Sequence, residues 1–148
     1  MRDKPYRYII GIDPGTKTGV AVWDRDIKDF ALLGTFSLIQ AFVELKPFIS
    51  SVVYRFPVLM RCENPNTWRP FNGRNDKAAA SRIQGAGSVK RDFAIWKEIA
   101  DYYTVPFEAV SLQSSQKKVT ADYFKKLTGI EKRTSEHARD AAMMVFKY

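Results

Sequence analysis

The first half of the chain alternates short apolar segments with turn residues, a pattern that predicts β-strands. Residues 7–13, 19–24 and 30–37 are predicted strands separated by short turns, so we expect an antiparallel meander. Residues 39–49 carry apolar side chains at helical spacing, although Pro47 is expected to kink or divide that helix. The chain is therefore predicted to begin with three strands and a helix that crosses them.

The second half alternates helical and strand patterns. The predicted elements are a strand at 57–63, a helix at 75–103, a strand at 106–111, and helices at 115–127 and 135–148. Gly129 is a plausible C-terminal cap between the last two helices. The long helix carries an apolar stripe formed by Val89, Phe93, Trp96, Ala100 and Tyr103. Such a stripe faces a core or contributes to a subunit contact.

This order predicts an α/β fold in which a mixed five-stranded sheet is flanked by helices. The chain has 148 residues, and no linker or repeat interrupts the pattern, so we expect one domain over residues 1–148.

The net charge limits the kinds of partner that the chain is expected to bind. The chain has 24 Lys and Arg against 16 Asp and Glu, a net charge of +8, which favours a polyanion such as nucleic acid. No apolar run approaches the length of a membrane-spanning helix, so no membrane partner is expected. The single cysteine, Cys62, and an N-terminus unlike a secretory signal predict a cytoplasmic protein.

Two of the predicted strands end in an acidic residue, Asp13 before Pro14-Gly15 and Glu63 before Asn64-Pro65. A carboxylate that follows an apolar strand is costly unless it is paired or bound to a cation. The same residues also form plain turns for conformational reasons alone. A metal-binding role and a simple turn both remain open from the spacing.

A third acidic position lies in the last predicted helix, where His137 and Asp140 are three residues apart and share a face. On an exposed face they would simply be solvated. Ala138, Ala141 and Ala142 surround Asp140, and these small residues allow the helix to approach another element closely.

Together these segments resemble the RuvC family of Holliday junction resolvases, within the RNase H-like superfamily. The resemblance rests on Gly11–Gly15 with Thr18–Ala21, on Glu63, and on His137–Ala142. It extends over residues 75–90 and 106–120, so most of the chain is covered in the same order. Sugar kinases and actin-like ATPases carry a similar first turn, but they need a second lobe that 148 residues cannot supply.

The resemblance implies that Asp13, Glu63, His137 and Asp140 form a catalytic tetrad that binds two Mg²⁺ or Mn²⁺ ions. Many family members have an acid at the position of His137, and histidine shifts the preference slightly toward Mn²⁺. The implied reaction is a pair of symmetric nicks in a four-way DNA junction, leaving 5′-phosphate and 3′-hydroxyl ends. Two cuts need two active sites, so the resemblance also implies a homodimer.

The resemblance further implies DNA contacts through aromatic and basic side chains. These candidates are Trp68, Arg69, Phe71, Arg74, Lys77, Arg82, Lys90, Lys117 and Lys118, with Arg91 beside them. Trp68 or Phe71 is the expected wedge between base steps, although Trp68 could instead pack onto the core. Two adjacent lysines are also typical of a solvated helix end.

One departure from the family concerns Thr120–Phe124, which replaces the glycine-rich stretch that many relatives carry. A compact member of this kind would suit a phage or mobile-element enzyme. Two alternatives stay open: a broader branched-DNA or flap nuclease with the same tetrad, and a non-catalytic nucleic-acid-binding scaffold.

Overall fold

The computed structural model describes residues 5–50, 56–67, 77–112 and 118–148, with residues 67 and 77–82 described by their backbone alone. The strands are β1 (Tyr8–Asp13), β2 (Thr18–Asp24), β3 (Asp29–Phe36), β4 (Val58–Glu63) and β5 (Phe107–Val110). The helices are α1 (Leu38–Ile49), a short 3₁₀ turn η1 (Pro65–Thr67), α2 (Lys77–Tyr102), α3 (Ala121–Thr128) and α4 (Glu136–Met143).

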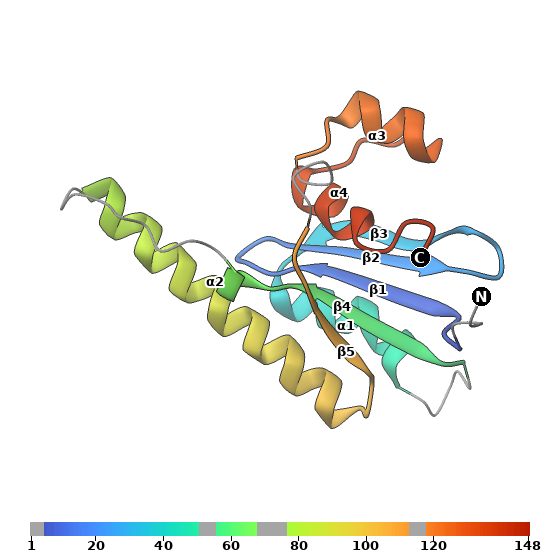
Figure 1. Cartoon of the computed structure of the whole chain (residues 1–148), viewed down its shortest axis with the longest axis horizontal. Helices are drawn as coiled ribbons and strands as arrows, with labels where there is room; N and C mark the ends of the chain where they lie inside the picture. Colours follow the sequence, from blue (N-terminus) through green and yellow to red (C-terminus); the bar gives the residue numbers. More distant parts are fainter. Residues whose placement is uncertain (1–4, 51–55, 68–76, 113–117) are drawn as a thin grey trace.

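The five strands form one mixed sheet in the order β3-β2-β1-β4-β5 (Figure 1). The pairs β1–β2 and β2–β3 are antiparallel, whereas β4 runs parallel to β1 and β5 runs parallel to β4. The predicted α/β architecture, a mixed five-stranded sheet flanked by helices, is confirmed.

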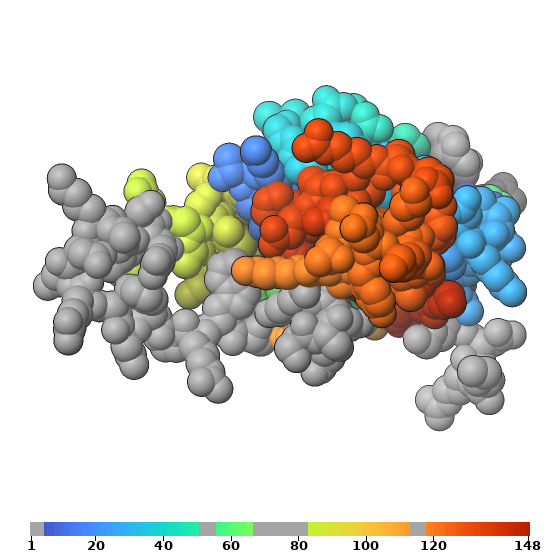
Figure 2. Space-filling view, turned by 90° about the horizontal axis from the view of Figure 1, so that it is seen from above, coloured from blue at the N-terminus to red at the C-terminus, as the bar shows by residue number. Residues whose placement is uncertain are grey.

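Side-chain alternation along the strands divides the core into two layers. Ile10, Ile12 and Met60 point to the face that is covered by α1 and the C-terminal half of α2. Ile9, Ala21 and Leu59 belong to the opposite layer, with α3 and α4. In Figure 2, which looks from above Figure 1, α3 and α4, in orange and red, lie in the middle of the view.

The apolar stripe of α2 faces the first layer. Trp96 and Ala100 are fully buried, and Phe93 and Tyr103 pack against the same cluster. Val89 is half-buried. Most residues of the stripe therefore face the core of this chain rather than a subunit contact. The N-terminal half of α2 extends past the edge of the sheet (Figure 1).

All four α-helices that the structure describes differ from the predicted ones in their bounds, by one or two residues for α1 and α2 and by more for α3 and α4. Helix α1 is not divided by Pro47, which lies in its last turn, where the helix ends two residues later at Ile49. Helix α3 begins at Ala121 because the Thr120 side chain accepts a hydrogen bond from the Tyr123 backbone N–H. Gly129 ends it at φ 77°, as predicted for a C-cap.

The last helix is shorter than its apolar pattern suggested. Helix α4 ends at Met143, and the chain then continues as turns to Lys147, whose φ is 57°. Among the described residues, none of the helices combines the length and apolar character that crossing a bilayer requires.

Candidate metal centre

Two acidic residues meet where neighbouring parallel strands end. Asp13 is the last residue of β1 and Glu63 the last of β4, and the two strands are in register, with Ile12 beside Cys62. Strand alternation turns both carboxylates toward the α4 face of the sheet. Each residue is only 8% exposed. The prediction that these two strands end in acidic residues is confirmed.

Helix α4 approaches this edge closely because β1 and β2 carry glycine at the contact. Gly19 is the residue paired with Asp13, and a Cβ there would lie 2.0 Å from the carbonyl oxygen of His137. A Cβ on Gly11 would lie 2.3 Å from the carbonyl oxygen of Ala141. Only glycine leaves room for the helix backbone at these two points. The buried Ala138, Ala141 and Ala142 supply the small helix side of the contact, as predicted.

The same helix brings His137 and Asp140 to the strand ends. Ser135 caps α4 by accepting a hydrogen bond from the Ala138 backbone N–H, so the helix begins beside the site. His137 Nδ1 lies 2.8 Å from Asp13 Oδ2, although the His137 side chain is still 48% exposed. The Asp140 carboxylate accepts a hydrogen bond from the backbone N–H of Lys118 at 3.2 Å.

Burial and like charges disfavour ionised carboxylates at this edge. Burial, together with the charges of Glu63 and Asp140, raises the pKa of Asp13 to about 7, against the opposing effect of His137. Burial also raises the pKa of Asp140, with a further contribution from Glu63. The Cys62 thiol has a raised pKa because it is buried next to Asp13 and Glu63. These acids are therefore near enough to repel one another.

The donor set suits a hard divalent cation. Carboxylate oxygens are the ligands that Mg²⁺ and Mn²⁺ prefer, and a cation would offset the repulsion that raises the pKa of Asp13. In the described part of the chain, no three His, Cys, Asp or Glu side chains already form a metal-binding group. Magnesium sites in nucleotide chemistry commonly use one or two carboxylates together with water and substrate phosphates. The residues thus fit an open metal site rather than a closed cage.

The structure describes only some of the residues proposed to contact DNA. Trp68, Arg69, Phe71, Arg74 and Lys117 lie outside the described residues, so the wedge interpretation is untested. The backbone of α2 carries Lys77 and Arg82.

Among the basic candidates with described side chains, Lys90 is exposed on α2. Lys118 is exposed beside Asp140, with φ at 53°. Arg91 pairs with the buried Asp92 at 3.1 Å. Lys118 is thus the basic candidate that the structure brings next to the predicted tetrad.

Sequence reasoning did not identify how two residues contribute to this site. Gly19 makes room for α4, and Lys118 contributes through its backbone N–H rather than its charge. The small residues of α4 predicted that the helix packs closely on another element, but they did not identify Gly19 as the residue it packs against.

Comparison of the chain with models of known protein families found no match, and a search of curated protein sequences found no significant relative.

Proposed function

We propose that this protein is a metal-dependent, structure-selective DNA endonuclease of the RuvC type that resolves four-way junctions. The observation that carries the proposal is the convergence of Asp13, Glu63, Asp140 and His137 from three separate elements at one edge of the sheet. The net charge of +8 supports a polyanionic substrate. The strand order β3-β2-β1-β4-β5, three antiparallel strands continued by two parallel ones, supports the RNase H-like assignment.

In this proposal Asp13, Glu63 and Asp140 supply oxygen ligands at the mouth of the site. When bound, two Mg²⁺ or Mn²⁺ ions would activate water and stabilise the leaving oxygen of an in-line displacement at phosphorus. His137, the fourth predicted ligand, contacts the Asp13 carboxylate through Nδ1, and its side chain is 48% exposed. Lys118 lies where a phosphate flanking the cut could be bound.

A homodimer belongs to the same proposal, because two symmetric nicks in one junction require two active sites. The expected products carry 5′-phosphate and 3′-hydroxyl ends. The protein would act in recombination or in the repair of branched DNA.

The test is to incubate the protein with a synthetic four-way junction, a flap and a linear duplex, in Mg²⁺, Mn²⁺ or EDTA, and to map the product ends. Paired, metal-dependent nicks confined to the junction are expected. Glu63→Gln should lower the rate at least about 100-fold, as loss of a catalytic electrostatic group does. The exposed Glu98 offers the matched control Glu98→Gln, which should cut normally.

Other outcomes separate the alternatives. Cutting of flaps and junctions alike would favour the broader branched-DNA nuclease. Binding without cutting in either metal would overturn the enzyme and leave the non-catalytic scaffold.

A further inference from the structure

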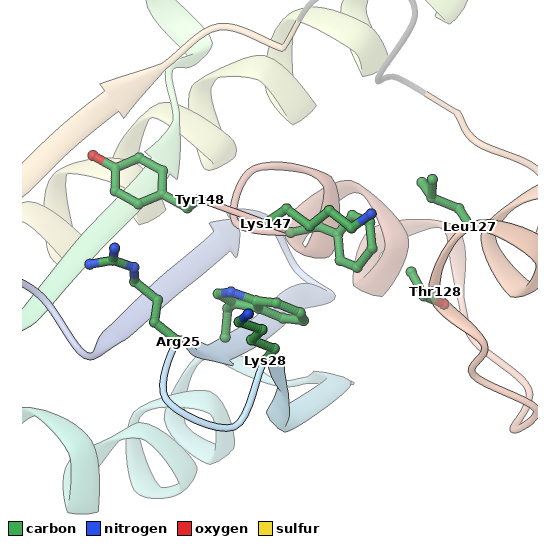
Figure 3. A pocket seen from close by; sticks show the side chains of 8 residues that line it. Arg25, Lys28, Leu127, Thr128, Lys147 and Tyr148 are labelled. Carbon is green, nitrogen blue, oxygen red and sulfur yellow. The ribbon is translucent and has the colours of Figure 1, made fainter. Parts of the chain in front are cut away.

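A pocket lies on the α4 face of the sheet, at the end of β2 opposite the candidate metal centre. It has a volume of about 570 Å³ and lies among the β2–β3 turn, the last residues of α3 and the C-terminal segment (Figure 3). We call it the aromatic–basic pocket after its lining residues Trp23, Arg25, Lys28, Phe146, Lys147 and Tyr148. Trp23 is four residues along β2 from Gly19, so its Cα lies about 13 Å from the Cα of the residue paired with Asp13.

The charged side chains that line the aromatic–basic pocket are all basic. Lys28 and Lys147 are exposed at its rim, and Arg25 donates a hydrogen bond to the Tyr6 carbonyl oxygen at 2.8 Å. Its described lining includes no acidic residue. The nearby carboxylates of Asp24 and Asp26 instead pair with Arg7, at 3.0 and 3.2 Å. The pocket is therefore suited to an anion.

The two rim lysines adopt a backbone conformation that usually selects glycine. Lys28 has φ at 55° and Lys147 has φ at 57°. A strained backbone is a reason to ask what the side chain does there. Figure 3 shows Lys28 entering from the β2–β3 turn and Lys147 from the C-terminal segment. Two segments far apart in sequence thus bring an ammonium group to the same hollow.

Aromatic side chains line the pocket together with these cations. Trp23 and Phe146 contact edge to face, with centroids 5.3 Å apart. The Lys147 ammonium lies 5.2 Å from the Phe146 ring centroid. Phe146 and Tyr148 are each partly exposed, although the Phe30 ring stacks on Phe146 and the Arg61 guanidinium lies 4.7 Å from the Tyr148 ring centroid. A planar ligand would contact only the part of these rings that stays exposed. A ligand that matches this lining carries both a flat ring system and negative charge.

We propose that the aromatic–basic pocket binds a nucleotide, with the base against the aromatic rings and the phosphate near Lys28 and Lys147. Bases stack on aromatic side chains in many single-strand sites, where lysine or arginine binds the backbone. The volume lies within the usual range for pockets that hold small ligands. This proposal does not rest on nuclease activity, because a nucleotide can bind here whether or not the metal centre cuts DNA.

The test measures binding of fluorescent oligothymidylates of increasing length in EDTA, by anisotropy at low salt, with thymidine monophosphate and inorganic phosphate as competitors. The double variant Lys28→Gln/Lys147→Gln should bind about tenfold more weakly, since it loses two charge-assisted contacts. Lys46→Gln/Lys97→Gln is the matched control, because both residues are exposed on α1 and α2 and the charge change is the same. Thermal melting of both variants checks that they fold.

Each outcome either supports or overturns the proposal that the pocket binds a nucleotide. Affinity that grows with length assigns the pocket to a nucleic-acid strand, and equal affinity for the monophosphate assigns it to a free nucleotide; both support the proposal. Equal loss in the two double variants would overturn it, as would displacement by phosphate as effective as by thymidine monophosphate. Because EDTA removes the metals required for cleavage, failure here would not bear on the junction assay, and failure there would not bear on this one.

Discussion

At the scale of single residues, Asp13 carries the electrostatic argument for the proposed cation. Its carboxyl group is buried, and the nearby Glu63 and Asp140 repel its charge, which raises its pKa to about 7. In an unfolded chain an aspartate titrates near about 4. Folding therefore holds a proton on Asp13 across a range in which the unfolded chain has released it.

This difference predicts how the metal-free protein responds to pH. Between about pH 4 and pH 7 the folded state binds the extra proton, so the free energy of unfolding falls as pH rises. The slope attributable to one such group is at most about 1.4 kcal/mol per pH unit. Urea unfolding in EDTA, from pH 5 to pH 8, measures it.

The matched variant is Asp13→Asn, which cannot ionise and changes little volume. As pH rises to about 7, the wild type should lose stability relative to Asp13→Asn. Above that pH the difference in unfolding free energy should stay constant. If the unfolding free energies of the two proteins changed with pH in parallel, the raised pKa of Asp13 would not be the cause of the pH dependence. Added Mg²⁺ at pH 8 should restore part of the wild-type stability, because a ligand that binds only the folded state stabilises it.

At the scale of elements, the site depends on how closely α4 lies on β1 and β2. The glycine at position 19 is opposite Asp13 in the sheet and beneath the His137 backbone. The contact is between main chains, so a side chain at position 19 cannot be accommodated by a rotamer change. The helix, and with it His137 and Asp140, would have to shift.

We therefore expect Gly19→Ala to lower the free energy of unfolding by roughly 2–4 kcal/mol, an overpacking cost at the upper end of the usual range. Cleavage should fall more than stability alone explains, since the tetrad would be displaced. Chemical denaturation and junction cleavage below the melting point measure the two effects.

The control for this change is Gly87→Ala on α2, where an added Cβ meets nothing within 4 Å. It should raise stability by up to about 1 kcal/mol, because alanine favours a helix over glycine. Equal effects at positions 19 and 87 would show that α4 does not rest on Gly19.

The elements that sequence predicted well are those whose pattern is local. Strands β1, β2 and β4 are buried apolar runs bounded by Asp, Pro and Gly, so their positions follow from composition and turn chemistry. The end of α4 was missed because Val145 and Phe146 continue the apolar spacing, yet they pack from a turn rather than a helix. Spacing alone cannot separate those two arrangements.

The residues of the candidate site could be proposed from the sequence, but the contacts that bring them together could not. Strand-end acids and an alanine-flanked Asp140 are visible along the chain, and the structure brings them to one edge. The His137–Asp13 contact, the Lys118 N–H bond and the aromatic–basic pocket each join segments more than 20 residues apart. Such contacts depend on the relative position of whole elements, which no short pattern records.

At the scale of the whole molecule, a net charge of +8 predicts that junction binding is strongly salt-dependent. Each cation that neutralises a phosphate releases counterions and adds about 0.9 to the slope of log affinity against log salt concentration. Lys90, near the middle of α2, has an exposed side chain. If α2 lies along a DNA arm, Lys90 contributes one such contact.

Lys90→Gln should then weaken junction binding uniformly across sequences and reduce the salt slope by about 1. Lys46→Gln, on α1 across the sheet from the metal centre, removes the same charge and should leave the slope unchanged. Electrophoretic mobility titrations of Asp13→Asn backgrounds in EDTA, from 50 to 200 mM salt, avoid cleavage during the measurement. Equal slopes in the two lysine variants would mean that the positive charge acts as a diffuse field around the molecule, because α2 then makes no phosphate contact of its own.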